Sequence, residues 1–428
     1  MGQWRNIRRL PVFVGLRVWI FRSRECADYD GSCLRRFAMN DVVILSACRT
    51  PIGKFQGALS SLSATDLGAH VVRAAIEQAH VTPERIDEVI LGNVLAAGVG
   101  QAPARQAALA AGLPPTVAAL TINKVCGSGL KAIMLAAQAI RAGDADIIVA
   151  GGMESMSRAP YLLERTGPPL GERKLLDVLL QDGLTCPFSG RSMGQIAEAL
   201  AKSDGLTRED QDLYAAESHR RAVAAIAQGL FDREVVPLTV KQRKAEIVMT
   251  CDEGPRTETT SEQLARLTPV FDAAGTVTAG NASTISDGAA AVVVASRVFQ
   301  EAHGLTPLAR IVAYATAGTE PGDLFVAPVA AITKALHRAG VAINDVDLFE
   351  INEAFAAQML TCVRRLQLPL EKVNVHGGAI ALGHPLGASG ARVVTTLLHA
   401  LRQRRQRWGV AALCLGGGNA VAAVFERL

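Results

Sequence analysis

The sequence predicts an α/β fold with two similar halves and a segment inserted between them. Short apolar runs alternate with stretches of helical periodicity, beginning with "DVVIL" at residues 41–45 and "SATDLGAHVVRAAIEQA" at 63–79. The apolar runs are nearly continuous, as in "ADIIVAGG" at 145–152, which is typical of sheets covered by helices on both faces. A chain of 428 residues also exceeds one ordinary core, so two or three domains are expected.

An internal repeat supports the two halves. "VTPERIDEVILGNVLAAG" at 81–98 matches "VAINDVDLFEINEAFAAQ" at 341–358 at a constant offset, and Asp87 corresponds to Asp347. Each copy is followed by a glycine-rich turn that opens a helix, and then by an apolar strand that ends in glycines. A duplicated α/β unit explains this pattern, and loops of both units are expected to meet near a pseudo-twofold axis.

The stretch at 156–286 has another character, with charged and Pro/Gly-rich runs around a helical pattern at 207–229. Because the periodicity persists, we interpret it as an inserted subdomain. The predicted domains are an extension at 1–38, an N-terminal half at 39–155 with 287–306, the insertion at 156–286, and a C-terminal half at 307–428.

Residues 1–38 differ from the rest of the chain, with eight arginines, no lysine and three acidic residues. Met39 opens "MNDVVILSACRTPIGKF", which has the pattern of a natural start, so a start codon placed too far upstream is the favoured interpretation. It goes with a cytoplasmic location. A cleaved organelle-targeting segment, which would make the protein mitochondrial, is the alternative. A secretory signal fits least, because Arg17 interrupts the apolar run.

Composition excludes several classes of function. The net charge of +4 is small for this length and gives no case for nucleic acid. The sequence holds no apolar run long enough to span a membrane. Eight scattered cysteines without ligand spacing argue against disulfides and against a metal site, and we expect no cofactor.

Cys126, in "NKVCGSGLKAI" at 123–133, is the first candidate for chemistry. A thiol attacks as the thiolate, and a helix N-terminus favours that anion. Gly127 and Gly129 would let the backbone approach a substrate closely and leave N–H groups free. The competing interpretation is a small buried residue in a tight turn.

Three further residues could act with it. His384 lies in a glycine-rich loop at 377–390 and could activate a thiol, or it could simply stabilise the loop. Cys414 ends an apolar strand, where a core residue is the usual interpretation. Asn352 in "EINEAF" could polarise a carbonyl group, or it could form an Asx turn that caps the next helix.

Together these motifs resemble the thiolase family, the acetyl-CoA acetyltransferases and 3-ketoacyl-CoA thiolases. The resemblance covers about 39–428, with the motifs in family order. It implies a duplicated fold with mixed central sheets in five layers (αβαβα) and an inserted loop domain. The motifs are "NKVCGSGLKA", "GGMESMS", "GNAS", "SDGAAA", "NEAFA", "NVHGGAIALGHPLGASG" and "CLGGG".

The resemblance also implies a reaction, the reversible CoA-dependent cleavage of 3-ketoacyl-CoA or condensation of two acetyl-CoA, through an acyl-cysteine intermediate. Cys126 would be the acylated nucleophile and His384 its base. Asn352 would hold a water for the first oxyanion hole, and Cys414 would be the second acid/base. The N–H groups of Cys126 and Gly416 would form the second oxyanion hole. Coenzyme A is then a substrate rather than a cofactor.

Residues of the loop domain and its surroundings would bind CoA and the acyl chain, and "SRAPYLLERTGPPLGERKLLD" resembles a loop that joins dimers into a homotetramer. For Arg256 the plainer interpretation is an exposed charge. The CoA and acyl-chain residues implied by the resemblance are Ser283, Arg256, Leu184, Met193, Phe271 and Phe355.

Several positions depart from the family pattern and leave the acyl-chain length open. Ser192 stands where His is usual, and Leu324–Phe325 where Met–Gly is common; His376 and Asn419 also differ. A short-chain acetyl-CoA acetyltransferase is the expected function, with a longer-chain thiolase of β-oxidation as the alternative. A decarboxylating synthase on the same fold and a non-catalytic acyl-CoA-binding protein are more remote.

Overall fold

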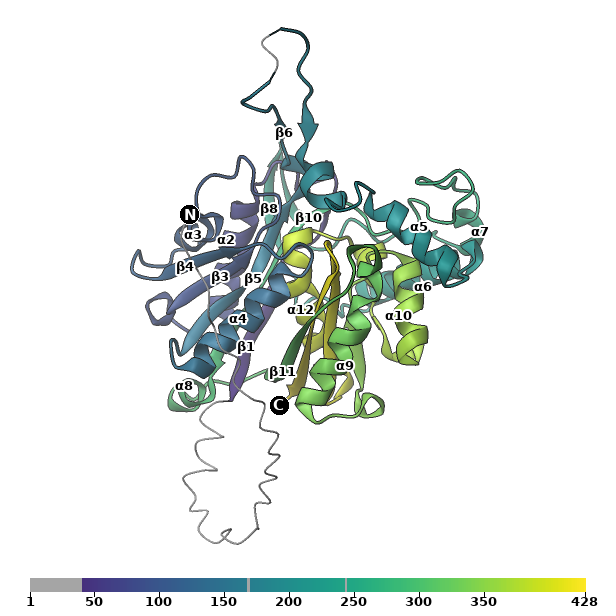
Figure 1. Ribbon diagram of the computed structural model, residues 1–428. Helices are drawn as coiled ribbons and strands as arrows, with labels where there is room; N and C mark the ends of the chain where they lie inside the picture. Colours follow the sequence, from purple (N-terminus) through teal and green to yellow (C-terminus); the bar gives the residue numbers. More distant parts are fainter. Residues whose placement is uncertain (1–40, 168–169, 243–244) are drawn as a thin grey trace, which may run out of the picture. The chain divides into compact units, whose positions relative to one another are not determined.

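The computed structural model describes residues 41–167, 170–242 and 245–428, so the predicted extension at 1–38 lies outside the described residues. Figure 1 shows a sheet flanked by helices. The strands of the N-terminal half are β1 (Val42–Arg49), β2 (Gly53–Lys54), β3 (Glu88–Gly92), β4 (Ala118–Ile122), β5 (Ile147–Ser155) and β10 (Ser286–Ser296). Those of the C-terminal half are β11 (Ala309–Gly318), β12 (Leu348–Ile351), β13 (Trp408–Leu415) and β14 (Asn419–Arg427).

The two halves repeat one strand arrangement. In the first, β3 runs parallel to β5, and β10 pairs antiparallel with β5 and β1. In the second, β12 runs parallel to β13, and β14 pairs antiparallel with β13 and β11. A short antiparallel contact between β1 and β11, at Val43–Arg310 and Ile44–Ala309, joins both halves into one ten-stranded sheet within the described residues.

Helices form three layers around the sheets. Helices α4 (Ser128–Ala142) and α12 (Leu386–Arg404) pack on each other between the halves and share one apolar core with both. Helices α2 (Ala64–Gln78) and α3 (Pro103–Ala110) cover the outer face of the first half, and α9 (Ala327–Ala339) covers that of the second with α10 (Ala356–Leu366) beside it. The five-layer α/β fold predicted from the sequence is confirmed.

The aspartates of the internal repeat do the same work in both halves. Asp87 Oδ2 accepts hydrogen bonds from the backbone N–H groups of Asp146 and Ile147, at 2.7 and 2.9 Å. Asp347 Oδ2 accepts from Arg407 and Trp408 at 2.9 and 2.8 Å. Each carboxylate therefore satisfies the first donors of the neighbouring parallel strand, which explains why the repeat keeps this residue type.

Between the halves the chain forms small elements and two longer helices. The predicted helix at 207–229 is found as α6 (Arg208–Ala227), which begins with a capping box of Thr207 and Asp210. A hairpin of β6 and β7 supports an arm that projects at the top of Figure 1. The other elements of this stretch are η2 (Met156–Arg158), β6 (Tyr161–Leu162), β7 (Leu176–Asp177), a π-helical turn η3 (Leu179–Leu184), α5 (Met193–Ser203), β8 (Leu238–Gln242), β9 (Ala245–Met249) and α7 (Ser261–Leu264).

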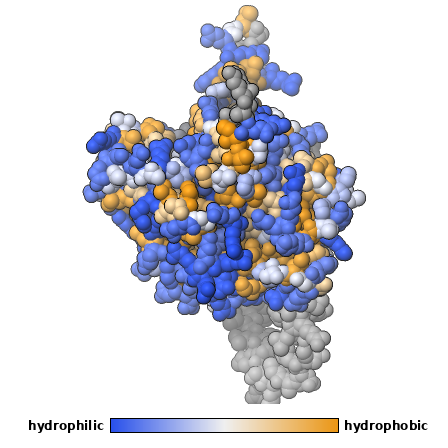
Figure 2. All heavy atoms as spheres, turned by 180° about the vertical axis from the view of Figure 1, so that it is seen from behind, coloured by the Kyte–Doolittle hydropathy of each residue, from blue (hydrophilic) through white to orange (hydrophobic). Residues whose placement is uncertain are grey.

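In Figure 2, the face behind that of Figure 1 is mostly hydrophilic with apolar residues interspersed. No helix among the described residues is long and apolar enough to cross a membrane.

Short helices complete the connections between these elements. They are η1 (Pro83–Arg85), α8 (Arg297–Ala302), η4 (Pro321–Val326), η5 (Ile343–Asp345), η6 (Leu370–Lys372) and α11 (Ala379–Leu382).

Candidate active site

Cys126 occupies a strained turn between β4 and α4. Val125 before it adopts a left-handed backbone with a φ of 47°. The hydroxyl of Ser128 accepts a hydrogen bond from the N–H of Lys124 at 2.8 Å and donates to the carbonyl of Val125 at 2.7 Å. These bonds hold the turn closed and leave the Cys126 thiol partly exposed at a cavity. Both interpretations of the sequence therefore meet: the turn is tight, and its thiol is accessible.

The glycines after Cys126 lie against the C-terminal half of the chain, where a side chain would not fit. A Cβ atom on Gly127 would lie 2.3 Å from Leu415 Cδ2, and one on Gly129 would lie 2.6 Å from the backbone nitrogen of Ala391. Gly390 shows the same constraint from the other side, with a Cβ only 2.1 Å from the nitrogen of Leu130. Gly129 and Gly390 therefore permit the close crossing of α4 and α12, and Gly127 permits the close approach of Leu415 in β13.

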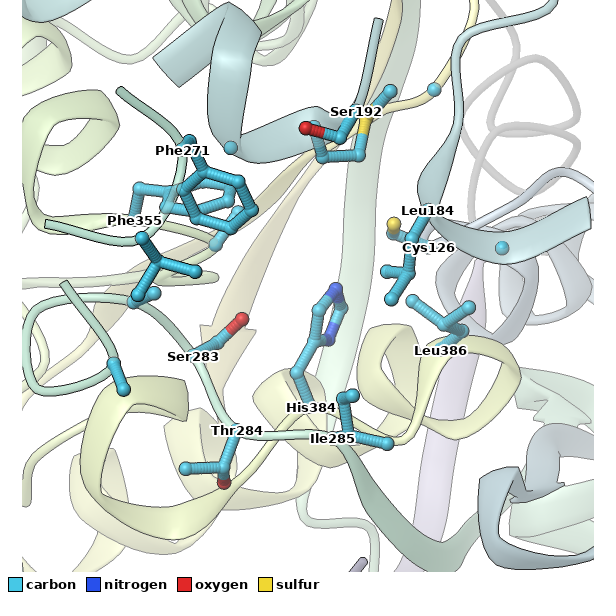
Figure 3. Close-up of a pocket in the computed structure, with 18 of the residues that line it drawn as sticks. Cys126, Leu184, Ser192, Phe271, Ser283, Thr284, Ile285, Phe355, His384 and Leu386 are labelled. Atoms are coloured by element: carbon cyan, nitrogen blue, oxygen red, sulfur yellow. The ribbon is translucent and has the colours of Figure 1, made fainter. Parts of the chain in front are cut away.

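This crossing places loops of both halves around one cavity of about 610 Å³. Cys126 comes from the first half, whereas His384, Cys414 and Gly416 come from the second, and all four line it. In Figure 3 the imidazole of His384 extends into the cavity between Cys126 and Ser283. The expected meeting of the Cys126 and His384 loops is found.

The orientation of His384 is fixed by Ser389. His384 Nδ1 lies 2.6 Å from Ser389 Oγ, whose own proton is donated to the carbonyl of Pro385 at 2.8 Å. Ser389 Oγ must therefore accept, so the proton sits on Nδ1 and Nε2 carries a free electron pair. Burial, and secondarily the charge of Arg392, lower the pKa of His384 to about 3. The ring is neutral at physiological pH and can act as a base.

The surroundings of Cys126 favour the protonated thiol over the thiolate that the helix N-terminus alone would favour. Burial raises its pKa to about 12, although the backbone N–H groups of Cys126 itself and Gly416 act in the opposite direction. Nearby Glu154 adds to the increase. A thiol of this kind needs a neighbouring base when it attacks, and neutral His384 is such a base. The two N–H groups also lie where an oxygen on an acylated sulfur could be bound.

Asn352 directly follows β12 and contacts His384, but it is not among the residues that line the cavity. Its Nδ2 is 3.4 Å from both ring nitrogens of His384. The alternative of an Asx turn is wrong: Oδ1 is buried and has no hydrogen-bond partner among the described residues, and α10 begins at Ala356 without a side-chain cap. An unpartnered buried oxygen is typical of a site that holds water.

Cys414 lies near the end of β13 and is 2% exposed. It packs with Leu324, Phe325 and Phe355, yet its side chain also lines the cavity. Burial raises its pKa well above the ordinary value, and the Cys126 thiol contributes to this increase. The core-strand interpretation and the acid/base interpretation are therefore compatible, since this buried thiol faces the same space as Cys126.

The residues that the resemblance suggested for CoA and the acyl chain line the same cavity. The rings of Phe325 and Phe355 meet edge to face at 5.3 Å between centroids, next to Cys414. The lining residues predicted from the sequence are Ser283, Arg256, Leu184, Met193, Phe271 and Phe355. Among those that sequence reasoning missed are Lys54, Leu180, Val270, Ile285 and Leu386. An apolar loop residue gives no sequence signal for such a role.

The departures from the family pattern divide into two groups. Ser192 lines the cavity and forms a capping box with Gln195 at the start of α5, and Leu324 and Phe325 line the cavity as well. His376 instead packs edge to face on Phe231, 5.9 Å between centroids, and is not among the residues that line the cavity. Asn419 begins β14 and lies opposite Leu415 of β13 in the sheet.

The residues described here contain no cluster of side chains able to hold a metal ion.

Comparison with known proteins agrees with this geometry. Residues 42–298 match the family described as "Thiolase, N-terminal domain", and 305–427 match "Thiolase, C-terminal domain". An acetyl-CoA acetyltransferase of Escherichia coli (strain K12) is 56% identical over 91% of this chain and 100% of its own length. One from Cupriavidus necator is 53% identical over the same shares. The crystal structure of the Bacillus anthracis acetyl-CoA acetyltransferase, 44% identical, superposes with a TM-score of 0.90 over 91% of this chain and 100% of that one. The chain belongs to the thiolase family.

Proposed function

We propose that this chain is an acetyl-CoA acetyltransferase, an acyltransferase that interconverts acetoacetyl-CoA plus CoA with two molecules of acetyl-CoA. The observation that carries the proposal is the single cavity lined by Cys126, His384, Cys414 and Gly416. A neutral base beside one thiol, with a second thiol facing the same space, fits the breaking of a carbon–carbon bond next to a thioester. The names of the relatives support the same substrates.

In the first half-reaction Cys126 Sγ attacks the 3-keto carbon of acetoacetyl-CoA while His384 Nε2 takes the thiol proton. The bond between C2 and C3 breaks, and acetyl-CoA leaves as its enolate. His384 and a water held by Asn352 stabilise the enolate oxygen, and Cys414 supplies the proton to carbon. The low pKa of His384 and the unpartnered Oδ1 of Asn352 support these roles.

In the second half-reaction the thiol of CoA attacks the acetyl group on Cys126. The Cys414 thiolate formed in the first step takes the CoA proton, and the N–H groups of Cys126 and Gly416 hold the carbonyl oxygen. Cys126 then recovers its proton from His384, so the enzyme returns to its starting state. Both N–H groups lie against the Cys126 sulfur, which supports this oxyanion hole.

A short acyl chain is favoured by the end of the cavity near Cys414. Leu324 and Phe325 are 1% and 2% exposed there, and Phe355 closes the same wall. Two rings and an isobutyl group leave little room for a long alkyl tail. The alternative, a thiolase acting on longer 3-ketoacyl-CoA, is supported by the name "Probable acetyl-CoA acyltransferase" of two relatives from Staphylococcus aureus, 51% and 50% identical.

The described residues of the projecting arm, 161–167 and 170–175, support the further proposal of a homotetramer. It carries apolar side chains that are largely exposed in the single chain: Tyr161 67%, Leu163 54%, Leu170 89% and Leu175 60%. Exposed apolar groups on a projecting arm are typical of protein contacts. Sedimentation should give a tetramer, and replacing these leucines by serine should give dimers.

The cytoplasmic location of the protein stays a prediction.

The test of the function compares thiolysis of acetoacetyl-CoA with thiolysis of 3-ketoacyl-CoA of six to ten carbons, each with added CoA. A strong preference for acetoacetyl-CoA supports the proposal, and equal or faster cleavage of the longer substrates replaces it with the long-chain alternative. Cleavage of neither, with no acetylation of Cys126 by acetyl-CoA, would mean that the chain only binds acyl-CoA.

A further inference from the structure

Two buried charged side chains lie on β12 and α12, the elements that Asn352 directly follows and His384 shortly precedes. Along β12 the side chains alternate, so Leu348 faces the inner core with α12 while Phe349 and Ile351 face the outer helices. Glu350 lies on the inner face, and Asn352 continues that face one step further. On α12, Arg392 follows Ser389 by about one turn. Glu350 and Arg392 therefore connect the strand that presents Asn352 to the helix that orients His384.

This pair is poorly satisfied for buried charges. Glu350 is 1% exposed and Arg392 2%, and one contact of 3.5 Å joins Arg392 Nη1 to Glu350 Oε2. Within the described ranges, Arg392 Nε and Nη2 and Glu350 Oε1 have no hydrogen-bond partner. A buried pair with such geometry recovers little of its desolvation cost, and apolar residues of similar size often stabilise a core better. Stability alone is thus a weak reason for these residues.

Arg392 lies in a buried cluster of charges that includes carboxylates other than Glu350. Four ionisable groups act on it: Glu350 from β12, Glu353 after β12, Glu234 before β8, and Arg49 from β1. The Glu353 carboxylate is satisfied by four other donors, on Tyr214, Ser218, Asn374 and Ile380.

Glu234 is bound by Arg49 at 2.6 Å and by Thr396 at 3.0 Å, while Asp252 binds Arg49 at 2.6 Å. Burial raises the pKa of Glu350 to about 8, against the effect of Arg392. Burial therefore weakens the counter-charge that Glu350 offers, and the guanidinium charge of Arg392 acts on His384 in the direction of a lower pKa.

We propose that Arg392, together with Glu350, is a positioning residue for the acyl-transfer site. The pair sets the spacing of β12 and α12 that brings the Asn352 amide against the His384 ring. The guanidinium charge also disfavours a second proton on that ring, so His384 rests as a free base and returns the proton that it takes from Cys126. The proposal rests on the acyltransferase function above and extends it to residues that do not touch the substrate.

The experiment compares Arg392→Met with Arg392→Lys in the full chain. Arg310→Met is the control for loss of an ion-paired arginine far from the cavity. Arg310 lies near the start of β11 and pairs with Glu426 and Asp41. Acetylation of Cys126 by acetyl-CoA is followed by mass spectrometry across pH, together with kcat, KM and the unfolding midpoint. We expect Arg392→Met to lower kcat by about ten- to a hundredfold with little change in KM. Its acid limb of acetylation should move to higher pH.

Arg392→Lys keeps the charge and should keep the acid limb near its original pH, although part of kcat is lost with the geometry. A lower unfolding midpoint in Arg392→Met and in Arg310→Met, with unchanged pH profiles in both, would mean that Arg392 is only structural and would overturn the proposal.

If Arg392→Met does not fold, Glu350→Gln decides. Glu350 loses its proton around pH 8 and then partly neutralises Arg392, so the wild-type acetylation rate should change between pH 7 and 9. Glu350→Gln should lack that change, and a wild-type profile in this variant would contradict the proposal. Failure of the wild-type chain to be acetylated would instead overturn the function and this inference with it.

Discussion

His384 Nδ1 and Ser389 Oγ are 2.6 Å apart, and the serine hydroxyl is already committed as a donor to Pro385. This relationship leaves Nε2 unprotonated on the side of the cavity. Ser389→Ala should free the Nδ1 proton and let the ring adopt the other tautomer or turn away. We expect kcat to fall about tenfold or more while KM for acetoacetyl-CoA stays nearly unchanged.

Steady-state kinetics of Ser389→Ala checks this expectation. Ser46→Ala is the matched control, because Ser46 is also 2% exposed or less and donates one hydrogen bond, to Ala75, in the outer layer. Equal losses of kcat in both variants would show that Ser389 supports folding and not the orientation of His384.

The roles of the two cysteines are separable. Cys126→Ala should form no acyl-enzyme with acetyl-CoA, whereas Cys414→Ala should still be acetylated slowly but should lose turnover. The reason is that acetylation by acetyl-CoA uses Cys414 only to protonate the departing CoA, which can leave slowly as a thiolate, whereas proton exchange with the enolate carbon depends on Cys414. Mass spectrometry of the protein and a coupled thiolysis assay measure the two steps separately. Normal turnover by Cys414→Ala would exclude its acid/base role.

Three buried histidines make the stability sensitive to acid. Burial lowers the pKa of His219 and His376 to about 4 and that of His384 to about 3. Because the unfolded chain protonates these groups near pH 6.5, it binds more protons than the folded chain as pH falls from there towards 4. The free energy of unfolding should therefore decrease over this window, by about 1–2 kcal/mol for each histidine at pH 5.

Urea unfolding at pH 7 and pH 5 measures this loss. His376→Phe is an informative variant, because His376 packs on Phe231 and does not line the cavity. It should lose less stability than the wild type between the two pH values. An equal loss would mean that His376 titrates normally in the folded protein.

Sequence reasoning predicted the fold, the duplicated halves and the cavity residues Cys126, His384 and Cys414, because these depend on local motifs and on a repeat. It could not predict the neutral thiol of Cys126, since its pKa depends on burial between two halves of the chain. It also could not predict that Gly127 contacts Leu415 and that Gly129 contacts Ala391, because these partners are far apart in the sequence. Ser389 gave no signal because its role requires the geometry of the α12 first turn.

Two aromatic side chains form the wall of the cavity beside Cys414. Phe325 packs on Phe355 and closes the cavity beside Cys414. Phe325→Leu should widen this end and raise the rate on a six-carbon 3-ketoacyl-CoA relative to acetoacetyl-CoA, because the added space accepts extra methylene groups, each worth about 0.8 kcal/mol of burial. Phe349→Leu, buried in the outer core, is the matched control and should change stability without changing the ratio. The ratio of kcat/KM values for the two substrates decides: an unchanged ratio in Phe325→Leu would mean that the acyl chain extends along another wall.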